Sequence, residues 1–404
     1  MNSKTSQNQR VLSGMRPTGL LHLGHYHGVL KNWVELQHSY ECFFFVADWH
    51  ALTTHYEDPS IIAKSSTDMV IDWLAAGVNP GSSTIFVQSR VPEHAELYTL
   101  LSMITPLGWL ERVPSYKDQQ EKLKEKDLAT YGFLGYPLLQ SADILMYKAG
   151  HVPVGEDQVA HIELTREVAR RFNHLYGKEP GFEEKVQAAI KKMGKKNAKI
   201  YNNVCKRFQE TGEEDAIEVG KALLDSQQNI SLGDKERLFG FLEGVGRIIL
   251  PEPQSLLTVS SKMPGLDGQK MSKSYGNTIS LRDTPEEVEK KVRMMPTDPA
   301  RVRRTDAGDP ENCSVWDMHQ VYSSTALKDS IVEGCKSASI GCVDCKQYIV
   351  DSINTELKPM RLRVKDYEED RTAIEVIINK GCEEARDVAR DTIEEVRKCM
   401  GLHY

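Results

Sequence analysis

The feature that most constrains the fold is an unbroken apolar run, CFFFVA at residues 42–47, that lies between two helical patterns. A strand that is apolar at every position is buried on both faces, as in a parallel sheet covered by helices. Shorter apolar runs at residues 11–13 and 84–87 accompany it, and helices are expected over about 21–37 and 59–76. This alternation of strand and helix predicts an α/β fold with a doubly wound parallel sheet.

Residue composition and predicted secondary structure change several times along the rest of the chain. Residues 97–150 and 161–176 show mainly helical patterns, and the stretch after them is richer in Lys, Glu, Asn and Gln. Loop residues dominate 250–275, and beyond Pro285 the pattern is almost wholly helical, with Gly401 as the cap of the last helix. The predicted divisions are an α/β domain (1–177), an inserted helical module (178–247), a return to the α/β domain (248–284) and a helical C-terminal domain (285–404).

Composition restricts the class of protein. With 404 residues, of which 40% are hydrophobic and 27% charged, the chain is expected to form two or three soluble domains. No apolar run approaches the roughly 18 residues of a membrane span, and the polar N-terminus lacks a secretory signal. A cytoplasmic protein without membrane contact is therefore expected. Its net charge of −7 does not indicate a nucleic-acid partner, although local basic clusters can still contact phosphates.

One motif, His22-Leu23-Gly24-His25, follows a strand and a Pro/Gly loop at the start of a predicted helix. Histidines three positions apart share one helical face, and Gly24 between them leaves room for a flat ligand on the backbone. The N-terminus of a helix favours anionic phosphate, and both imidazoles can donate to phosphate oxygens in a transition state. Taken alone, the pattern is also compatible with a pair of surface or core histidines.

A second motif, Lys270-Met271-Ser272-Lys273-Ser274, lies far along the chain in a loop bounded by glycines. Two lysines with hydroxyls between them can bind a triphosphate and stabilise the leaving pyrophosphate. A solvated lysine loop is the ordinary alternative. Neither motif is a Walker A loop, and the first strand–helix turn has no GxGxxG, which disfavours kinases and dehydrogenases.

Together the two motifs resemble the HIGH and KMSKS motifs of class I aminoacyl-tRNA synthetases. Residues 14–19 (GMRPTG), 136–145 (YPLLQSADIL), 152–158 (VPVGEDQ) and 161–166 (HIELTR) are similar to tryptophanyl-tRNA synthetase in particular. The likeness covers nearly the whole chain outside 178–247. It implies a Rossmann-type catalytic domain, an α-helical C-terminal domain that binds the anticodon, and a homodimer.

The resemblance also implies the reaction. The carboxylate of L-tryptophan attacks the α-phosphate of ATP, which enters with Mg²⁺, and the terminal hydroxyl of tRNA(Trp) then takes the acyl group. The matching catalytic residues are His22, His25, Lys270 and Lys273. Their contribution would be positioning and electrostatics, without a covalent nucleophile.

Asp143 matches the aspartate that accepts the indole N–H in this family. The indole ring offers one hydrogen-bond donor and no acceptor, so a carboxylate, which only accepts, is a suitable partner for recognising it. A site built around that bond rejects side chains that lack the donor. The other positions that match the family's tryptophan pocket are Tyr136, His50, Val152, Val154 and Gln158.

The ATP-contacting positions of the family match several segments of this chain. They are Arg16, Pro17, Thr18, Gly24, His25, Gly155, Glu156, Asp157, Lys262, Lys270, Met271, Ser272, Lys273 and Ser274. Leu12 and Gln140 depart from the family pattern, because well-known members carry Phe and Met there. The wall of the pocket is therefore expected to be packed differently at these two positions.

Four of the eight cysteines, Cys313, Cys335, Cys342 and Cys345, fall at C-x21-C-x6-C-x2-C in the C-terminal region. Four thiolates can complete a tetrahedral or cubane site. The spacing resembles that of a subset of bacterial tryptophanyl-tRNA synthetases with a [4Fe–4S] cluster beside the anticodon pocket. Zn²⁺ is the alternative metal, although a zinc ribbon normally shows two C-x-x-C pairs, and four unrelated buried thiols are a third reading. The other cysteines are predicted to be packing residues.

Arg301, Arg303 and Arg304 form a basic segment between the KMSKS-like loop and the first of these four cysteines. They are predicted to contact phosphates or a base edge of the tRNA. A solvated basic loop is an equally compatible reading.

Three alternative functions remain open at this point. Tyrosyl-tRNA synthetase shares both motifs, but a tyrosine hydroxyl needs partners that donate and accept, and that family's specific pattern is not found. A non-catalytic tRNA-binding paralogue is disfavoured by two intact motifs. A small-molecule ligase of the HxGH superfamily would lack the long helical C-terminal region.

Overall fold

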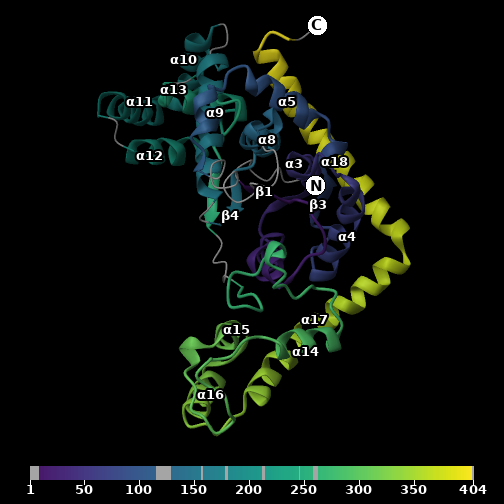
Figure 1. Ribbon diagram of the computed structural model, residues 1–404. Helices are drawn as coiled ribbons and strands as arrows, with labels where there is room; N and C mark the ends of the chain where they lie inside the picture. The colour runs from purple at the N-terminus through teal and green to yellow at the C-terminus, as the bar shows by residue number, and fades with distance from the viewer. Residues whose placement is uncertain are drawn as a thin grey trace. The chain divides into compact units, whose positions relative to one another are not determined.

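The computed structural model describes residues 9–114, 129–155, 158–177, 181–211, 214–244, 246–257 and 263–402 (Figure 1). The strands are β1 (Arg10–Met15), β2 (Glu41–Val46), β3 (Ser83–Val87), β4 (His151–Val154) and β5 (Gln254–Leu257). The helices of the first part are α1 (Leu23–His25), α2 (Lys31–Leu36), α3 (Asp48–His55), α4 (Ser60–Ala76), α5 (Glu93–Ser102), α6 (Leu107–Glu111), α8 (Tyr131–Met146) and α9 (Val159–Tyr176). Those that follow are α10 (Phe182–Lys192), α11 (Gly194–Thr211), α12 (Glu214–Asp225), α13 (Leu232–Leu242), α14 (Pro285–Arg293), α15 (Ser314–Tyr322), α16 (Thr325–Lys336), α17 (Cys342–Glu369) and α18 (Arg371–Cys399). Short 3₁₀ turns span Gln88–Arg90, Lys273–Tyr275 and Pro310–Asn312.

The five strands form one sheet in the order β3-β2-β1-β4-β5. β2 runs parallel to β3, with Cys42 opposite Ser83, and β1 runs parallel to β4, with Val11 opposite His151. The chain therefore moves from β1 outward to β3 and then returns to the other side of β1. This is a doubly wound arrangement, and the predicted α/β fold is confirmed.

The apolar run of β2 is buried as its composition predicts. Phe44 is fully buried, and its ring stacks on Trp33 with centroids 4.2 Å apart. Trp73 of α4 meets the edge of Trp33 at a centroid distance of 5.0 Å. Helix α4 thus covers β2 with large apolar side chains, and through Trp33 this packing also holds α2, which follows the HIGH-like motif.

The helix expected over 21–37 differs in detail. It begins at Leu23, and a π-helical segment, Tyr26–Leu30, separates α1 from α2. Such π segments are rare and are frequent at functional sites. Strands β4 and β5 were not among the predicted strands, because each has only four residues and Pro153 interrupts the apolar pattern of β4.

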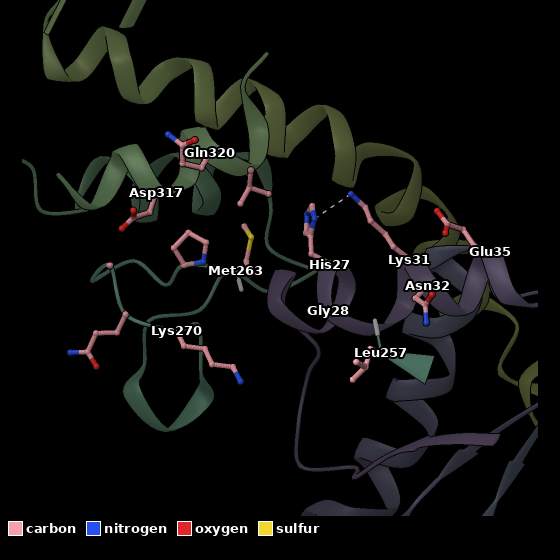
Figure 2. A pocket seen from close by; sticks show the side chains of 14 residues that line it. His27, Gly28, Lys31, Asn32, Glu35, Leu257, Met263, Lys270, Asp317 and Gln320 are labelled. Carbon is pink, nitrogen blue, oxygen red and sulfur yellow. Dashed lines mark hydrogen bonds between the residues drawn. The ribbon is translucent and has the colours of Figure 1, made fainter. Parts of the chain in front are cut away.

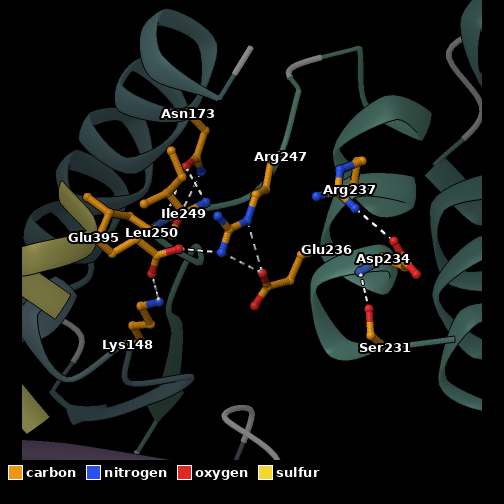
Figure 3. Close-up of polar contacts among 10 residues, drawn as sticks. All are labelled: Lys148, Asn173, Ser231, Asp234, Glu236, Arg237, Arg247, Ile249, Leu250 and Glu395. Atoms are coloured by element: carbon orange, nitrogen blue, oxygen red, sulfur yellow. Dashed lines mark hydrogen bonds and ion pairs between the residues drawn. The ribbon is translucent and has the colours of Figure 1, made fainter. Parts of the chain in front are cut away.

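The inserted stretch forms a helical module, α10 to α13, with a core of its own that includes Val186, Tyr201 and Leu238. Gly240 of α13 allows the chain to cross closely, since a Cβ there would lie 1.2 Å from the carbonyl oxygen of Gly246. Within the module, Asp234 pairs with Arg237 at 2.8 Å (Figure 3).

Polar contacts join this module to neighbouring helices. Arg247 bonds both Glu236 of α13 and Glu395 of α18, and Lys148 bonds the same Glu395 at 2.6 Å (Figure 3). The side chain of Asn173 in α9 binds the backbone of Leu250 in both directions, at 2.7 and 3.0 Å. Arg247 therefore connects α13 to α18 through a partly buried ion-pair group, and Asn173 fixes the backbone of the segment that follows the module.

The C-terminal region is helical, as expected after Pro285. α18 buries a stripe that includes Ile374, Ala385 and Val396, and Gly401 ends it with a φ of 76°. Among the described residues, no helix combines the length and the apolar character needed to cross a membrane.

The chain divides into two compact units. The first comprises the described parts of Met1–Leu12, Ser89–Leu256 and Glu383–Tyr404, and the second comprises Ser13–Gln88 and Leu257–Cys382. Both HIGH-like and KMSKS-like motifs and the four patterned cysteines belong to the second unit. The expected tryptophan-reading residues, apart from His50, belong to the first.

Candidate active site and cysteine centre

The two histidines of the HIGH-like motif are held in defined tautomers. His22 is the N-cap of α1, where its Nδ1 accepts from the Gly24 amide at 3.1 Å. His25 closes a capping box, because its Nδ1 accepts from the His22 amide at 3.3 Å. Nδ1 accepts in both rings, so a neutral imidazole carries its proton on Nε2. Each ring thus keeps an Nε2–H donor.

Both rings are neutral at physiological pH. Burial, and then the nearby Lys273 ammonium, lower the pKa of His22 to about 4. Burial, His22 and Lys273 lower the pKa of His25 well below its usual value. The ring centroids are 3.9 Å apart, so two charged imidazoles would repel strongly. The pair is suited to hydrogen-bond donation rather than to proton transfer.

Gly24 serves the histidine pair directly. A Cβ at this position would lie 2.9 Å from the His22 ring and 3.5 Å from Cβ of Met271. The space above this glycine, expected to admit a flat ligand, is bordered by the His22 ring and by the second motif. Any larger residue would push His22 out of its capping position.

Backbone pairing joins the two motifs. The Leu23 amide donates to the Ile279 carbonyl at 3.0 Å, and the Leu281 amide donates to the Leu21 carbonyl at 3.0 Å. A β-bridge links His22 to Ser280. The segment after the KMSKS-like loop is therefore tied to both sides of His22.

Lys273 reaches the loop that precedes the HIGH-like motif. Its Nζ donates to the carbonyls of Thr18 at 3.2 Å and Gly19 at 2.9 Å. Burial, and the repulsion of Arg16, lower the pKa of Lys273 to about 8, although Asp72 acts in the opposite direction. The hydrogen bonds that the structure gives this ammonium thus go to neutral carbonyls, which an anionic phosphate can replace.

Asn277 organises the KMSKS-like loop. It is 3% exposed, and its Oδ1 accepts from the Ser272 amide at 2.8 Å. Its Nδ2 donates to Asp267 at 2.7 Å and to the Lys270 carbonyl at 3.2 Å. One buried amide therefore holds the backbone at Lys270 and Ser272, a role that the sequence motif did not reveal.

Lys270, unlike Lys273, is exposed and lines a cavity of about 1010 Å³ (Figure 2). His27 and Lys31 line the cavity from the segment that follows the HIGH-like motif, and Asp317 and Gln320 line it from α15. Figure 2 shows the Lys270 side chain extending into the open space. Such a lysine can follow a mobile anionic ligand without breaking an existing ion pair.

Two residues that line this cavity, His27 and Lys31, are also bonded to residues of the C-terminal helices α15 and α17. Nε2 of His27 lies 2.9 Å from Glu356 of α17 and 3.0 Å from the hydroxyl of Tyr322 in α15. Lys31 pairs with the same Glu356 at 2.8 Å. Burial alone would raise the pKa of Glu356, but its bonds and charge contacts with His27 and Lys31 lower it to about 2. The network fixes the π segment after the HIGH-like motif against the C-terminal helices.

The structure collects only part of the predicted ATP site in one unit. Arg16, Pro17, Thr18, Gly24 and His25 belong to the second unit with the Lys270–Lys273 segment. Gly155 belongs to the first unit. Glu156, Asp157 and Lys262 lie outside the described residues, as does the side chain of Ser274.

The predicted tryptophan-reading residues lie mainly on α8, β4 and the start of α9. Asp143 is 1% exposed, and Tyr136 lies seven positions earlier on the same helix, with its hydroxyl 3.3 Å from Nε2 of His161. Val152 and Val154 are buried in β4, and Gln158 is the N-cap residue of α9. His50 is buried in α3 of the second unit.

Two buried residues next to Asp143 escaped the sequence prediction. Nδ1 of His94 lies 2.6 Å from Oδ1 of Asp143, and its Nε2 lies 2.7 Å from the hydroxyl of Tyr147. His94 and Tyr147 are 0% exposed. The i, i+4 spacing of Asp143 and Tyr147 was visible in the sequence, but nothing there linked them to a histidine on α5.

Three helix ends bring the four patterned cysteines into one region. Cys313 precedes α15, Cys335 lies in the last turn of α16, and Cys342 and Cys345 lie in the first turn of α17. Burial, followed by the charges of the other three thiolates, raises the pKa of Cys345 to about 12. The four sulfurs are therefore near enough to interact electrostatically.

These sulfurs do not converge on one point. Within the part of the chain that the structure describes, no group of three or more His, Cys, Asp or Glu could hold a metal ion. Nε2 of His319 lies 3.2 Å from Sγ of Cys345, and Arg301 donates to Sγ of Cys335 at 3.8 Å.

The three arginines predicted to meet tRNA differ in environment. Arg301 also donates to the carbonyls of Ile340 at 2.5 Å and Arg304 at 3.2 Å, so its guanidinium braces the cysteine region. Arg303 and Arg304 are exposed, and Arg304 has only a loose pair with Asp344 at 3.6 Å. The latter two are therefore accessible to a phosphate.

The sequence matches the family described as tRNA synthetases class I (W and Y) over residues 4–201 and 216–358. It is 66% identical over 396 residues to the tryptophan–tRNA ligase of Ralstonia nicotianae, covering 98% of this chain and 99% of that one. The chain belongs to the tryptophan–tRNA ligase family.

Other members of this family differ more. The tryptophan–tRNA ligase of Thermotoga maritima is 45% identical over 397 residues, with 98% of this chain and 100% of that one covered. The crystal structure of tryptophanyl-tRNA synthetase from Campylobacter jejuni, complexed with ADP and tryptophan, matches with a TM-score of 0.71 and 26% identity. It covers 97% of this chain and 100% of that chain. The Rossmann-type prediction agrees with this likeness.

Proposed function

We propose that this member of the family activates L-tryptophan with ATP and transfers the product to tRNA(Trp). The reaction gives tryptophanyl-adenylate and pyrophosphate first, and tryptophanyl-tRNA second. The observation that carries the proposal is the pairing of the two motifs in one unit, with Nζ of Lys273 2.9 Å from the Gly19 carbonyl. This pairing surrounds the N-terminus of α1 with neutral and cationic donors.

In the first step the chain binds and stabilises the triphosphate. Nε2–H of His22 and of His25 donate to phosphate oxygens, while Lys273 leaves the Thr18 and Gly19 carbonyls for the anion. Lys270 meets the departing pyrophosphate from the cavity side. Mg²⁺ enters with ATP as the counter-ion of its phosphates. The carboxylate of tryptophan is the nucleophile, so no side chain needs to form a covalent bond.

The amino acid is chosen by Asp143. Its buried carboxylate accepts the indole N–H, and Tyr136, Val152, Val154 and Gln158 of the same unit are the other pocket residues. The family match also includes His50, which belongs to the second unit. A side chain without a donor, such as that of phenylalanine, would leave this carboxylate without that bond. Discrimination by a desolvated hydrogen-bonding group is strong, because the wrong ligand leaves it unpaired.

A [4Fe–4S] cluster on Cys313, Cys335, Cys342 and Cys345 is part of the proposal. The spacing of the four cysteines supports it, together with their positions at the ends of three helices, where the charges of the other three sulfurs act on Cys345. When bound, the cluster would join the ends of α15, α16 and α17 and could carry one electron. Iron, acid-labile sulfide and zinc, measured after anaerobic purification, decide the cofactor. About four iron and four sulfide per chain supports the cluster, whereas zinc or no metal contradicts it.

The remaining partners follow from the reaction. The helical C-terminal domain would bind the anticodon, with Arg303 and Arg304 on the tRNA phosphates and Arg301 bracing the cysteine region. Cytoplasmic residence follows from the substrate, since charged tRNA supplies translation. We also propose a homodimer, for which Met103, Leu107 and Tyr131, large side chains that are 56–71% exposed in the first unit, offer apolar surface. Light scattering of the purified chain tests it.

Aminoacylation tests the proposed function. Purified chain, ATP, Mg²⁺ and tRNA(Trp) transcript should incorporate radiolabelled tryptophan into acid-precipitable tRNA. The Arg303→Ala/Arg304→Ala double variant should reduce charging and spare ATP–pyrophosphate exchange. A chain that exchanges pyrophosphate without ever charging tRNA would instead be a small-molecule ligase.

A further inference from the structure

His94 forms a buried hydrogen-bonded chain with Asp143 and Tyr147 in the first unit. The three side chains are 0%, 1% and 0% exposed, and the two links measure 2.6 and 2.7 Å. Short links between desolvated groups are stronger than their equivalents in water. Such a chain also specifies orientation, because each member has limited freedom to rotate without breaking a bond.

The direction of the chain follows from the chemistry of its ends. An ionised carboxylate only accepts, so Nδ1 of His94 donates to Asp143. In the neutral imidazole with this tautomer, Nε2 accepts, and the hydroxyl of Tyr147 donates to it. Tyr147 thus selects the His94 tautomer, and His94 fixes the plane of the Asp143 carboxylate.

The helix that carries His94 is itself anchored. Glu93, the preceding residue, is 8% exposed and pairs with Arg386 of α18 at 2.8 Å. α5 approaches α8 closely at Gly135, where a Cβ would lie 2.3 Å from the hydroxyl of Tyr98. His94 therefore lies on a rigid element, as a residue that orients another group requires.

We infer that His94 is the positioning residue that orients Asp143 for the indole N–H, and that Tyr147 sets its tautomer. The inference rests on the proposed reading of tryptophan by Asp143. A carboxylate held at one oxygen by His94 accepts an N–H from a restricted direction. His94 thereby contributes to specificity for indole without touching the substrate.

The test compares tryptophan with 3-(benzothiophen-3-yl)alanine, in which sulfur replaces the indole N–H. ATP–pyrophosphate exchange gives kcat/KM for both substrates, and their ratio measures how well the N–H is read. His94→Phe should lower this ratio about tenfold or more, mainly through the KM for tryptophan, with the KM for ATP unchanged. His94→Asn, whose amide can donate from nearly the Nδ1 position, should restore most of it.

Two further variants keep the test decisive if His94→Phe does not fold. Tyr147→Phe removes only the hydroxyl that sets the tautomer and should lower the ratio several-fold. Tyr98→Phe removes a hydroxyl from the same α5–α8 contact without touching Asp143, and it should leave the ratio unchanged. A ratio that is unchanged in Tyr147→Phe and His94→Phe, or a loss that is equal for both substrates, overturns the inference.

Asp143→Ala separates this inference from the proposed function. If Asp143→Ala lowers the ratio and the His94 variants do not, the inference alone fails. If Asp143→Ala leaves the ratio unchanged, Asp143 does not read the N–H. If the unaltered chain shows no tryptophan-dependent exchange, the proposed function itself is wrong.

Discussion

The region proposed to bind phosphate and the region proposed to read tryptophan are built in opposite ways. The first consists of loops and a helix start, where donors such as Lys273 are bound to backbone carbonyls that a ligand can replace. The second consists of helices, where Asp143 is buried in a side-chain network that is complete before a ligand arrives. Charge that must follow a reacting phosphate requires mobile donors, whereas selection of a flat ring requires fixed ones.

Among the variants that test this difference between the two regions, Lys273→Ala should have the largest effect. It removes the ammonium that stabilises the pyrophosphate, and kcat for ATP–pyrophosphate exchange should fall about 10²–10³-fold. The Kd for tryptophan, measured by equilibrium dialysis, should remain unchanged because the amino-acid site is built separately. Lys290→Ala, on the exposed face of α14, is the matched control. A comparable rise in the Kd for tryptophan would show that the two regions are not independent.

Asn277→Ala should have the next largest effect. Without the buried amide, the backbone at Ser272 and Lys270 loses its partners, and kcat/KM for ATP should fall about tenfold. The free energy of unfolding should fall by about 1–3 kcal/mol, as a urea titration would show. Asn203→Ala, at an exposed amide of α11, should change neither quantity. A normal kcat/KM in Asn277→Ala would mean that the loop does not need this support.

The pH dependence of kcat/KM for ATP should have the next largest effect, and it should depend on Lys273. With a pKa of about 8, Lys273 loses its proton as the pH rises through 8, and kcat/KM for ATP should fall by up to tenfold per pH unit above that value. His22, with a pKa of about 4, stays neutral over this range and does not contribute to the pH dependence of kcat/KM. Lys273→Arg should move the alkaline limb beyond pH 10. A limb that persists unchanged in this variant assigns the titration to another group.

Tyr136→Phe should have the smallest effect. Its hydroxyl makes a long contact of 3.3 Å with His161, at the half-buried edge of the amino-acid pocket. Loss of this bond should raise the KM for tryptophan two- to five-fold and leave kcat nearly unchanged. A much larger rise in the KM for tryptophan would indicate that Tyr136 lies at the centre of the pocket and not at its edge.

The same contrast explains what the sequence could predict. The HIGH-like and KMSKS-like residues are contiguous and lie on loops and a helix start, so local pattern was enough to find them. Three of the five strands followed from the apolar runs, and helices were expected within 178–247, where α10 to α13 lie. Asn277 and His94 act through contacts across the fold, and no local spacing reveals a buried amide or a histidine on another helix. The π segment at Tyr26–Leu30 was missed because its apolar pattern fits an ordinary helix.

ATP–pyrophosphate exchange with tryptophan and, separately, with tyrosine tests the central claim most directly. The account predicts exchange that depends on tryptophan and stays at background with tyrosine, because the carboxylate of Asp143 suits a donor without an acceptor. Exchange supported by tyrosine alone, or equally by both amino acids, would contradict it.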